Sequence, residues 1–177
     1  KMPNGESLYG PRDGLKNVTI YELASIFTLM ANYHESKEDA DLRMLLATIY
    51  RPKKRLVGTT SDVRVGLYKN DDQKRVEKRA RLWRKAPELV KSLLHFWLQC
   101  CRQVIVTSPE LAVLFEKSGR GKEDPHGWAG TLLHLANESV VHLDAAATTP
   151  WPQALRQLAR EKQQALDAEE RARWARR

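Results

Sequence analysis

Residues 87–106 read PELVKSLLHFWLQCCRQVIV, the longest strongly apolar run of the 177-residue chain. Pro87 and Glu88 suit the first turn of a helix. The apolar side chains recur at helical spacing, and their stripe is much wider than the face that a surface helix buries. They are Leu89, Val90, Leu93, Leu94, Phe96, Trp97, Cys100, Cys101, Val104 and Ile105. The pattern predicts a central helix covered on most sides, with Trp97 nearly fully buried.

Start and stop signals on either side of this run predict further helices. Thr19-Ile20-Tyr21-Glu22 has the form of a capping box and opens a helix to about Tyr33. A second helix runs from about Ser36 to Arg51, where Pro52 blocks its continuation, and the two form a hairpin. Further helices are expected over residues 70–85, 108–115 and 126–141. The sequence therefore predicts an all-α fold, a single helical bundle of about six helices.

Composition along the chain predicts four parts. Residues 1–18 are rich in Gly and Pro and form an N-terminal arm, pinned to the body by Tyr9 and Leu15. Residues 19–143 form the helical bundle. Residues 144–152, small side chains followed by two prolines, form a linker. Residues 153–177 form a charged helix whose apolar edge is thin, so it projects from a bundle that folds without it. Its predicted contacts with a partner are Leu155, Leu158, Leu166 and Trp174.

The net charge of +8 is concentrated in one region. Residues 51–91 contain 14 Lys or Arg against 5 Asp or Glu and carry the whole basic excess. Such a patch can face nucleic acid or an acidic protein surface, or it can be a solvated helix face with acidic residues such as Glu35, Glu38 or Asp41 nearby. Its candidate anion-binding residues are Lys53, Lys54, Arg55, Lys74, Lys78, Arg81 and Lys85.

One set of side chains has a spacing that can bind metal. His134, Glu138 and His142 stand at i, i+4 and i+8 of the helix expected over residues 126–141. Successive members drift by about 40° around the helix, so one ion could not take all three without distortion. No second ligand motif completes a site, and we expect no metal and no cofactor.

The cysteines raise the question of a thiol nucleophile. Cys100 and Cys101 are adjacent and cannot form an ordinary disulfide with each other, which fits a reducing compartment. They lie in the most apolar helix, close to His95, whereas a catalytic thiol needs a partly exposed, electropositive site. Buried structural thiols are the favoured interpretation, and no phosphate-binding loop or nucleophile elbow occurs. We therefore expect no catalytic residues.

Several stretches, read together, resemble a known group of proteins. They are LYGPRDGLKNVTIYEL at residues 8–23, LLATIYRPKK at 45–54, SDVR at 61–64, LLHFWLQCCRQVIV at 93–106, SPELAVLF at 108–115 and HGWAGTLLHLA at 126–136. Their order and spacing resemble helical proteins encoded in the tail-gene clusters of bacteriophages and prophages. The resemblance covers residues 8–140 and is carried by packing residues such as Tyr50, Pro52, Trp97, Cys101 and Trp128. It implies a virion-associated or tail-assembly protein, including chaperones of the tape-measure type.

The expected function is thus that of a non-enzymatic phage structural or tail-assembly protein acting through protein–protein contacts. Its partners would be other virion or tail-assembly proteins, with a homo-oligomer left open, in the virion or the host cytoplasm. The alternative is a basic helical nucleic-acid-binding protein using residues 51–91. A third, weaker hypothesis is a metal-dependent hydrolase built on His134, Glu138 and His142. No membrane association is expected, because Lys91 and Arg102 interrupt a run that is already short for a membrane span.

Overall fold

The computed structural model describes residues 7–11, 13–52, 73–115 and 127–175. Within these residues the chain is helical and has two isolated β-bridges, so the all-α prediction is confirmed. The described residues contain eight α-helices rather than about six. They are α1 (Ile20–Ser36), α2 (Asp39–Ile49), α3 (Gln73–Trp83), α4 (Glu88–Val106), α5 (Ala112–Phe115), α6 (Gly127–Leu135), α7 (Leu143–Thr148) and α8 (Trp151–Ala175), with short 3₁₀ helices at Asp13–Leu15 and Val140–His142.

The α1–α2 hairpin is the centre of the core. Leu23 of α1 and Leu45 and Leu46 of α2 are completely buried. The predicted capping box is present: the Glu22 amide donates to the Thr19 hydroxyl at 3.2 Å, and the Thr19 amide donates to the Glu22 carboxylate at 3.3 Å. α1 ends at Ser36, three residues later than predicted. Lys37 then makes the turn to α2 in a left-handed conformation with φ 57°.

An ion pair lies inside this core. Arg51 follows α2 and is 1% exposed, and its Nη2 is 2.7 Å from Oε1 of Glu22, which is also buried. The acid that caps the start of α1 therefore also neutralises a cation just beyond the end of α2. Because both charges are out of water, the loss of either one would remove a close opposite charge from the other.

The described part of the N-terminal arm is tied to the body. Leu15 is completely buried, as predicted, whereas the Tyr9 side chain is 38% exposed and only the backbone of this residue is held, exchanging two hydrogen bonds of 2.9 and 3.1 Å with Arg51. A second bridge pairs Thr19 with Pro150, and the indole nitrogen of Trp151 donates to the Leu15 carbonyl at 2.8 Å. The start of α8 is thus fastened to the residues that precede α1.

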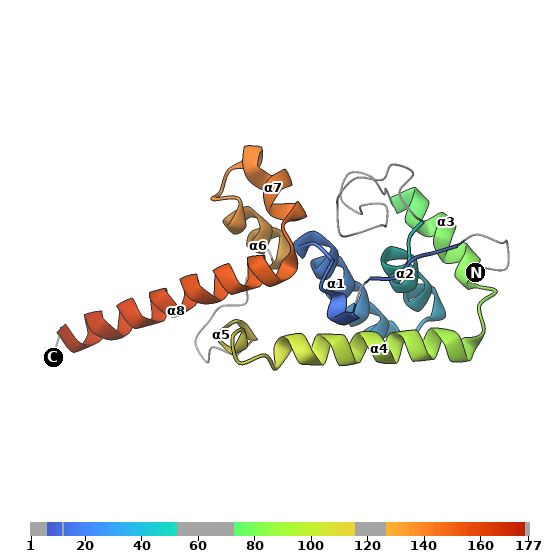
Figure 1. Cartoon of the computed structure of the whole chain (residues 1–177), viewed down its shortest axis with the longest axis horizontal. Coiled ribbons are helices and arrows are strands. Elements are labelled where there is room, and N and C mark those ends of the chain that lie inside the picture. Colours follow the sequence, from blue (N-terminus) through green and yellow to red (C-terminus); the bar gives the residue numbers. More distant parts are fainter. Residues whose placement is uncertain (1–6, 12, 53–72, 116–126, 176–177) are drawn as a thin grey trace.

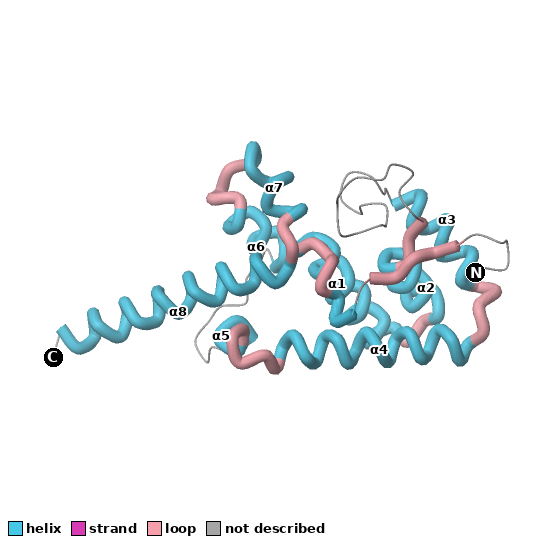
Figure 2. Tube along the Cα trace, in the orientation of Figure 1, coloured by secondary structure: helices cyan, strands magenta, loops and turns pink. Residues whose placement is uncertain are grey.

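Figure 1 shows how the helices are arranged around the hairpin. α4 runs along one long edge of the molecule, with α1 and α2 on its inner side, α3 next to α2 over one end of α4, and α5 beyond the other end. α6 and α7 lie on the far side of α1, and α8 leaves the body and continues well past α5 (Figures 1 and 2). The prediction that 87–106 is the central helix is therefore wrong: it is a helix, but a peripheral one.

Two further predictions fail at the C-terminal end of the body. The helix expected over 126–141 ends at Leu135, because Asn137 and Glu138 adopt positive φ angles of 52° and 58°. The Glu138 amide donates to the Leu133 carbonyl, a bond that terminates a helix instead of extending it. The expected linker over 144–152 is largely helical, because α7 packs Ala146 and Ala147 into the body and α8 begins at Trp151.

Candidate protein interfaces

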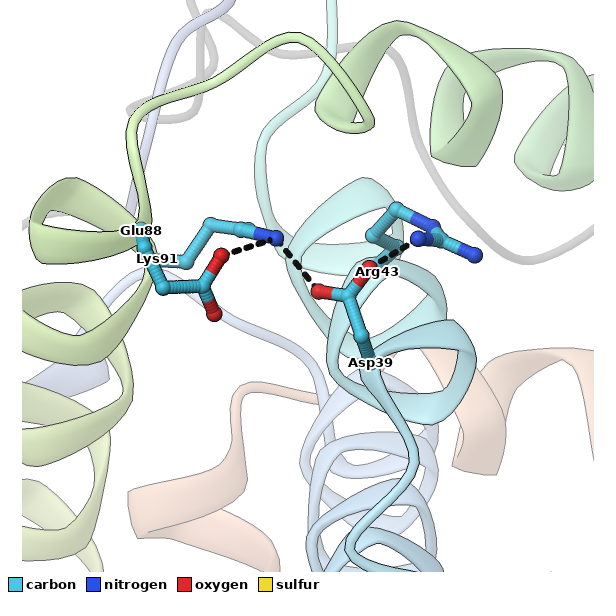
Figure 3. Close-up of polar contacts among 4 residues, drawn as sticks. All are labelled: Asp39, Arg43, Glu88 and Lys91. Atoms are coloured by element: carbon cyan, nitrogen blue, oxygen red, sulfur yellow. Dashed lines mark hydrogen bonds and ion pairs between the residues drawn. The ribbon is translucent and has the colours of Figure 1, made fainter.

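α4 is oriented by a polar contact near its first turn. Lys91 is 3% exposed, and its ammonium group lies between two carboxylates (Figure 3). One belongs to Glu88, 2.7 Å away on α4, and the other to Asp39 at the start of α2. Asp39 also pairs with Arg43 one turn along α2. This chain of charges fixes which side of α4 faces the hairpin.

The pKa of Lys91 reflects the same contact. Burial acts to lower it, but the hydrogen bonds and charges of Asp39 and Glu88 outweigh burial and raise the pKa above its usual value. Lys91 therefore stays charged at neutral pH although it is buried. The contact between Lys91 and Asp39, which joins α4 to α2, therefore keeps its cation at neutral pH.

The inner side of α4 is narrow. Besides Lys91, only Leu98, Cys101 and Ile105 are buried on this helix. Trp97 packs against the core but is only half-buried, so the predicted near-complete burial is not found. Cys101 is buried as expected, whereas Cys100 is exposed. The wide apolar face of α4 is thus mostly uncovered by the described part of the chain.

We call the exposed row on the outer side the α4 stripe. Its exposed fractions are large for apolar side chains: 70% for Leu89, 57% for Leu93, 67% for Phe96 and 70% for Val104, with exposed Cys100 completing the row. Contiguous apolar surface of this kind is typical of interaction sites. Val90, at 41%, extends the stripe on one margin.

α8 divides into two parts that differ in burial. Its first turns belong to the core, because Ala154, Leu155 and Ala159 are buried and Leu158 is half-buried. Leu155 was predicted as a partner contact, and its 2% exposure removes it from any free surface. The sequence did contain a signal that this part of α8 is buried. Small and large apolar residues at spacings of three and four suit close helix packing, and such a row is formed by Ala154, Leu155, Leu158 and Ala159.

Two polar contacts mark the end of the docked part of α8. Arg156 pairs with Glu110 at 2.9 Å, and His134 Nε2 lies 2.9 Å from the Glu161 carboxylate. Hydrogen bonds from Gln157 and His134 hold the pKa of Glu161 below its usual value. Residues 163–175, which we call the distal half of α8, are exposed throughout. Two predicted contact residues, Leu166 and Trp174, are 44% and 66% exposed there.

The basic flank of α3 is only partly as predicted. Lys74, Lys78, Arg81 and Lys85 are exposed, and none of these four side chains forms an ion pair within the part of the chain that the structure describes. Lys53, Lys54 and Arg55, the rest of the predicted patch, lie outside the described residues. The acidic residues Glu35, Glu38 and Asp41 are not seen paired with the flank.

Arg79 of α3 is buried although it belongs to the basic region 51–91. Its Nε donates to the Ala47 carbonyl of α2 at 3.0 Å. Val76, Ala80 and Trp83 are also buried and form the apolar edge of α3. Position 79 is three residues after Val76 and four before Trp83, so it lies on the same side of the helix as the buried row. This spacing could have predicted that Arg79 is buried.

The residues considered for chemistry do not form a constellation. His134 lies on α6, Glu138 in the turn after it and His142 at the end of a 3₁₀ helix, so the helix that would align them does not exist. Within the described ranges, no group of three or more His, Cys, Asp or Glu side chains is placed to hold a metal ion. Among these ranges there is also no helix with the length and apolarity needed to cross a bilayer.

A cavity of about 440 Å³ lies between α1, α2, α3 and α6. Its walls are mainly apolar and include Met44 and Trp128. Its polar lining consists of the hydroxyl-bearing residues Tyr21, Ser25, Thr28 and Thr48 and the amide of Gln73. Ser25 donates to the Tyr21 carbonyl and Thr48 donates to the Met44 carbonyl within their own helices, and Gln73 donates to Glu77.

Comparison with known proteins gives no relative for this chain: no family model, no curated protein and no solved structure matches it. The features that bear on function are therefore those of the molecule itself. They are the α4 stripe, the distal half of α8 and the basic flank of α3.

Proposed function

We propose that this chain is a non-enzymatic structural or assembly protein that works through protein–protein contacts, of the kind encoded in phage tail-gene clusters. Its partners are other virion or tail-assembly proteins, and it acts in the virion or in the host cytoplasm. The resemblance of residues 8–140 supports the phage assignment. The observation that carries the proposal is the distal half of α8, which leaves the body with two large apolar side chains exposed (Figure 1).

A helical segment that projects from the body needs a source of stability other than packing on that body. Helices of fewer than about 12–15 residues are marginal in water, and most helical stability comes from packing. Residues 163–175 make no packing contacts of the kind that bury Leu155, yet they present Leu166 and Trp174 about two turns apart on adjoining faces of the helix. Tryptophan is enriched among the residues that carry binding energy at interfaces. A partner groove that accepts these two side chains would stabilise the helix and explain its composition.

The proposal is tested by removing the two side chains without shortening the helix. Leu166→Ser with Trp174→Ser should abolish co-purification with the tail-cluster proteins encoded beside this chain. The melting temperature should stay within about 2 °C of the parent, because exposed substitutions seldom change stability by more than about 0.5 kcal/mol. Gln164→Ser with Ala172→Ser, on other faces of the same exposed segment, is the matched control and should retain every partner. Equal capture by both double variants would refute the proposal.

The alternative function, nucleic-acid binding by residues 51–91, is favoured by one observation. Lys74, Lys78 and Arg81 are exposed along α3 at spacings of four and three residues, where like charges destabilise a helix by a few tenths of a kcal/mol per pair, and exposed Lys85 follows in the turn after the helix. Binding through them would weaken steeply with salt, because phosphate contacts release counterions. We expect little DNA binding at physiological salt. Tight, salt-sensitive binding that is lost when Lys74, Lys78, Arg81 and Lys85 are changed to Gln would favour this alternative instead.

A further inference from the structure

The α4 stripe has an internal symmetry that indicates what covers it. Its members are separated by four, three, four and four residues, so they lie on one side of the helix. Consider a second copy of α4 that runs in the opposite direction, with the two-fold axis passing between positions 96 and 97. Leu89 of one copy then lies opposite Val104 of the other, Leu93 lies opposite Cys100, and Phe96 lies opposite Trp97. An antiparallel copy of α4 would therefore place an apolar or thiol side chain against each member of the stripe. Self-complementarity of this kind is what a two-fold interface requires.

Beyond the exposed Glu88 in the first turn of α4, the margin of the stripe is uncharged. Ser92, Gln99 and Gln103 lie beside it on the outer surface of α4. An acidic or basic partner would find no opposite charge along this row, whereas a second copy meets no like charge. Antiparallel packing also places the N-terminus of each helix beside the C-terminus of the other, so that opposite ends of the two helix dipoles are neighbours, which is favourable.

The area available is close to what a dimer needs. With about 150–250 Å² for a fully exposed large side chain, the exposed fractions of 41–70% give on the order of 600 Å² for the stripe and Val90 together. A standard interface buries about 800 Å² per partner, and the half-buried Trp97 and the polar margins supply further area. α4 is also accessible, because it forms one long edge of the molecule with its neighbours on the inner side (Figure 1).

We propose that the α4 stripe is a self-association surface, on which a second copy of this chain packs its own α4 in antiparallel orientation about a two-fold axis near Phe96. This goes beyond the proposed function and does not rest on it, because the distal half of α8 remains free in such a dimer to meet another protein. The two surfaces can therefore be tested separately.

The net charge of the chain makes a distinctive prediction for this dimer. Two molecules of charge +8 repel each other at long range, and salt screens that repulsion. An interface made of uncharged side chains loses nothing to the same salt. Dimerisation should therefore strengthen between 50 and 500 mM NaCl, whereas binding of nucleic acid or an acidic protein would weaken.

The first experiment is sedimentation velocity on the purified full chain over a range of concentrations at both salt levels. The parent should form a dimer that is tighter at high salt. Phe96→Glu should raise the dissociation constant by about 30-fold or more, as expected for a central interface residue. Ala40→Glu makes the same charge change at an exposed site on α2 and should dimerise like the parent. A chain that stays monomeric under all conditions, or a dimer that tolerates Phe96→Glu, would overturn the inference.

The second experiment tests orientation through cross-linking by a mild oxidant. Antiparallel packing brings position 93 of one copy against Cys100 of the other, so Leu93→Cys should give a disulfide-linked dimer. The bond cannot form within one helix, because seven residues span about 10 Å. Adding Cys100→Ser should abolish the link. A parent that cross-links through Cys100 itself would indicate parallel packing and contradict the proposed geometry.

Discussion

At the scale of single residues, the least replaceable side chains are the buried charges. Glu22 and Arg51 join the start of α1 to the residue after α2 through an ion pair that is almost completely out of water. Such a pair need not stabilise the fold more than apolar residues of the same shape. Its importance lies in the cost of breaking it, since each charge depends on the other.

A double-mutant cycle measures that dependence. Glu22→Gln keeps a side chain that can cap α1 but leaves Arg51 as a buried charge, and we expect a loss of about 3–5 kcal/mol. Arg51→Met should cost a similar amount. The double variant should cost clearly less than the two single changes combined, because it leaves neither charge behind. Urea unfolding gives all four free energies, and strict additivity would show that the two side chains do not interact.

His95 gives the molecule a response to mild acid. Its ring lies edge-on to that of Tyr33, with centroids 4.8 Å apart and planes at 83°. Burial lowers its pKa, and the charges of His34 and Lys37 lower it further. The unfolded chain, in which the pKa is about 6.5, then binds more protons than the folded one below that pH. Stability should therefore fall as the pH decreases from about 6.5 through the folded-state pKa.

The test compares the stability of the parent with that of the His95→Gln variant at pH 7 and at pH 5. The parent should lose more stability between pH 7 and pH 5 than His95→Gln does, as measured by the midpoint of urea unfolding at each pH. Parallel behaviour of the two proteins over this range would contradict a role for His95.

At the scale of elements, local signals predicted much of the fold. The capping box at Thr19 and the stop at Pro52 place α1 and most of α2 correctly, because both act within one turn of the chain. The end of α6 was missed because left-handed helix ends are usually formed by glycine, whereas Asn137 and Glu138 occupy that conformation here. Asparagine tolerates it better than most residues, so Asn137 was the available signal.

The position of α4 was missed for a different reason. Periodicity shows that a helix has a wide apolar face, but it contains no information about which molecule covers that face. The predicted helix has nearly the observed bounds, and yet its outer side is open. The residues of the α4 stripe, a candidate interface, therefore looked like core residues in the sequence.

The two sides of α4 should respond differently to the same substitution. Leu98→Ala removes a completely buried side chain and should cost about 2–5 kcal/mol. Leu93→Ala, on the stripe, should change the stability of the dilute monomer by no more than about 0.5 kcal/mol. Thermal unfolding at low concentration and low salt separates the two, and equal losses would mean that the stripe is covered within one chain.

At the scale of the whole molecule, the boundary of the folded body differs from the predicted one. The sequence suggested that the bundle would fold without the last helix, residues 153–177, because the apolar edge of that helix looked thin. In the structure Trp151, Ala154, Leu155 and Ala159 all pack on the core cluster. Alanine was underrated as a core residue, since its small side chain allows helices to approach closely.

Two truncations locate this boundary. A chain ending at Lys162 keeps the docked turns of α8, and its melting temperature should lie within about 2 °C of that of the parent. A chain ending at Thr149 loses the contacts of Leu155, worth about 2–5 kcal/mol alone, out of a total stability of about 5–15 kcal/mol. We expect it to be largely unfolded by circular dichroism. A folded Thr149 truncation would restore the original boundary.

The bond between Trp151 and Leu15 has a consequence for how the protein is made. The two residues are 136 positions apart, and the pairing of Thr19 with Pro150 spans nearly the same distance. A ribosome delivers residues in order, at about 5–20 per second, so the first helix of the nascent chain waits many seconds for the segment that closes over its start. Its hairpin with the next helix involves only near neighbours and can form early, whereas closure by the last helix involves the most distant contacts and comes late. During that interval the apolar surface around Leu15 is not yet covered by the start of α8.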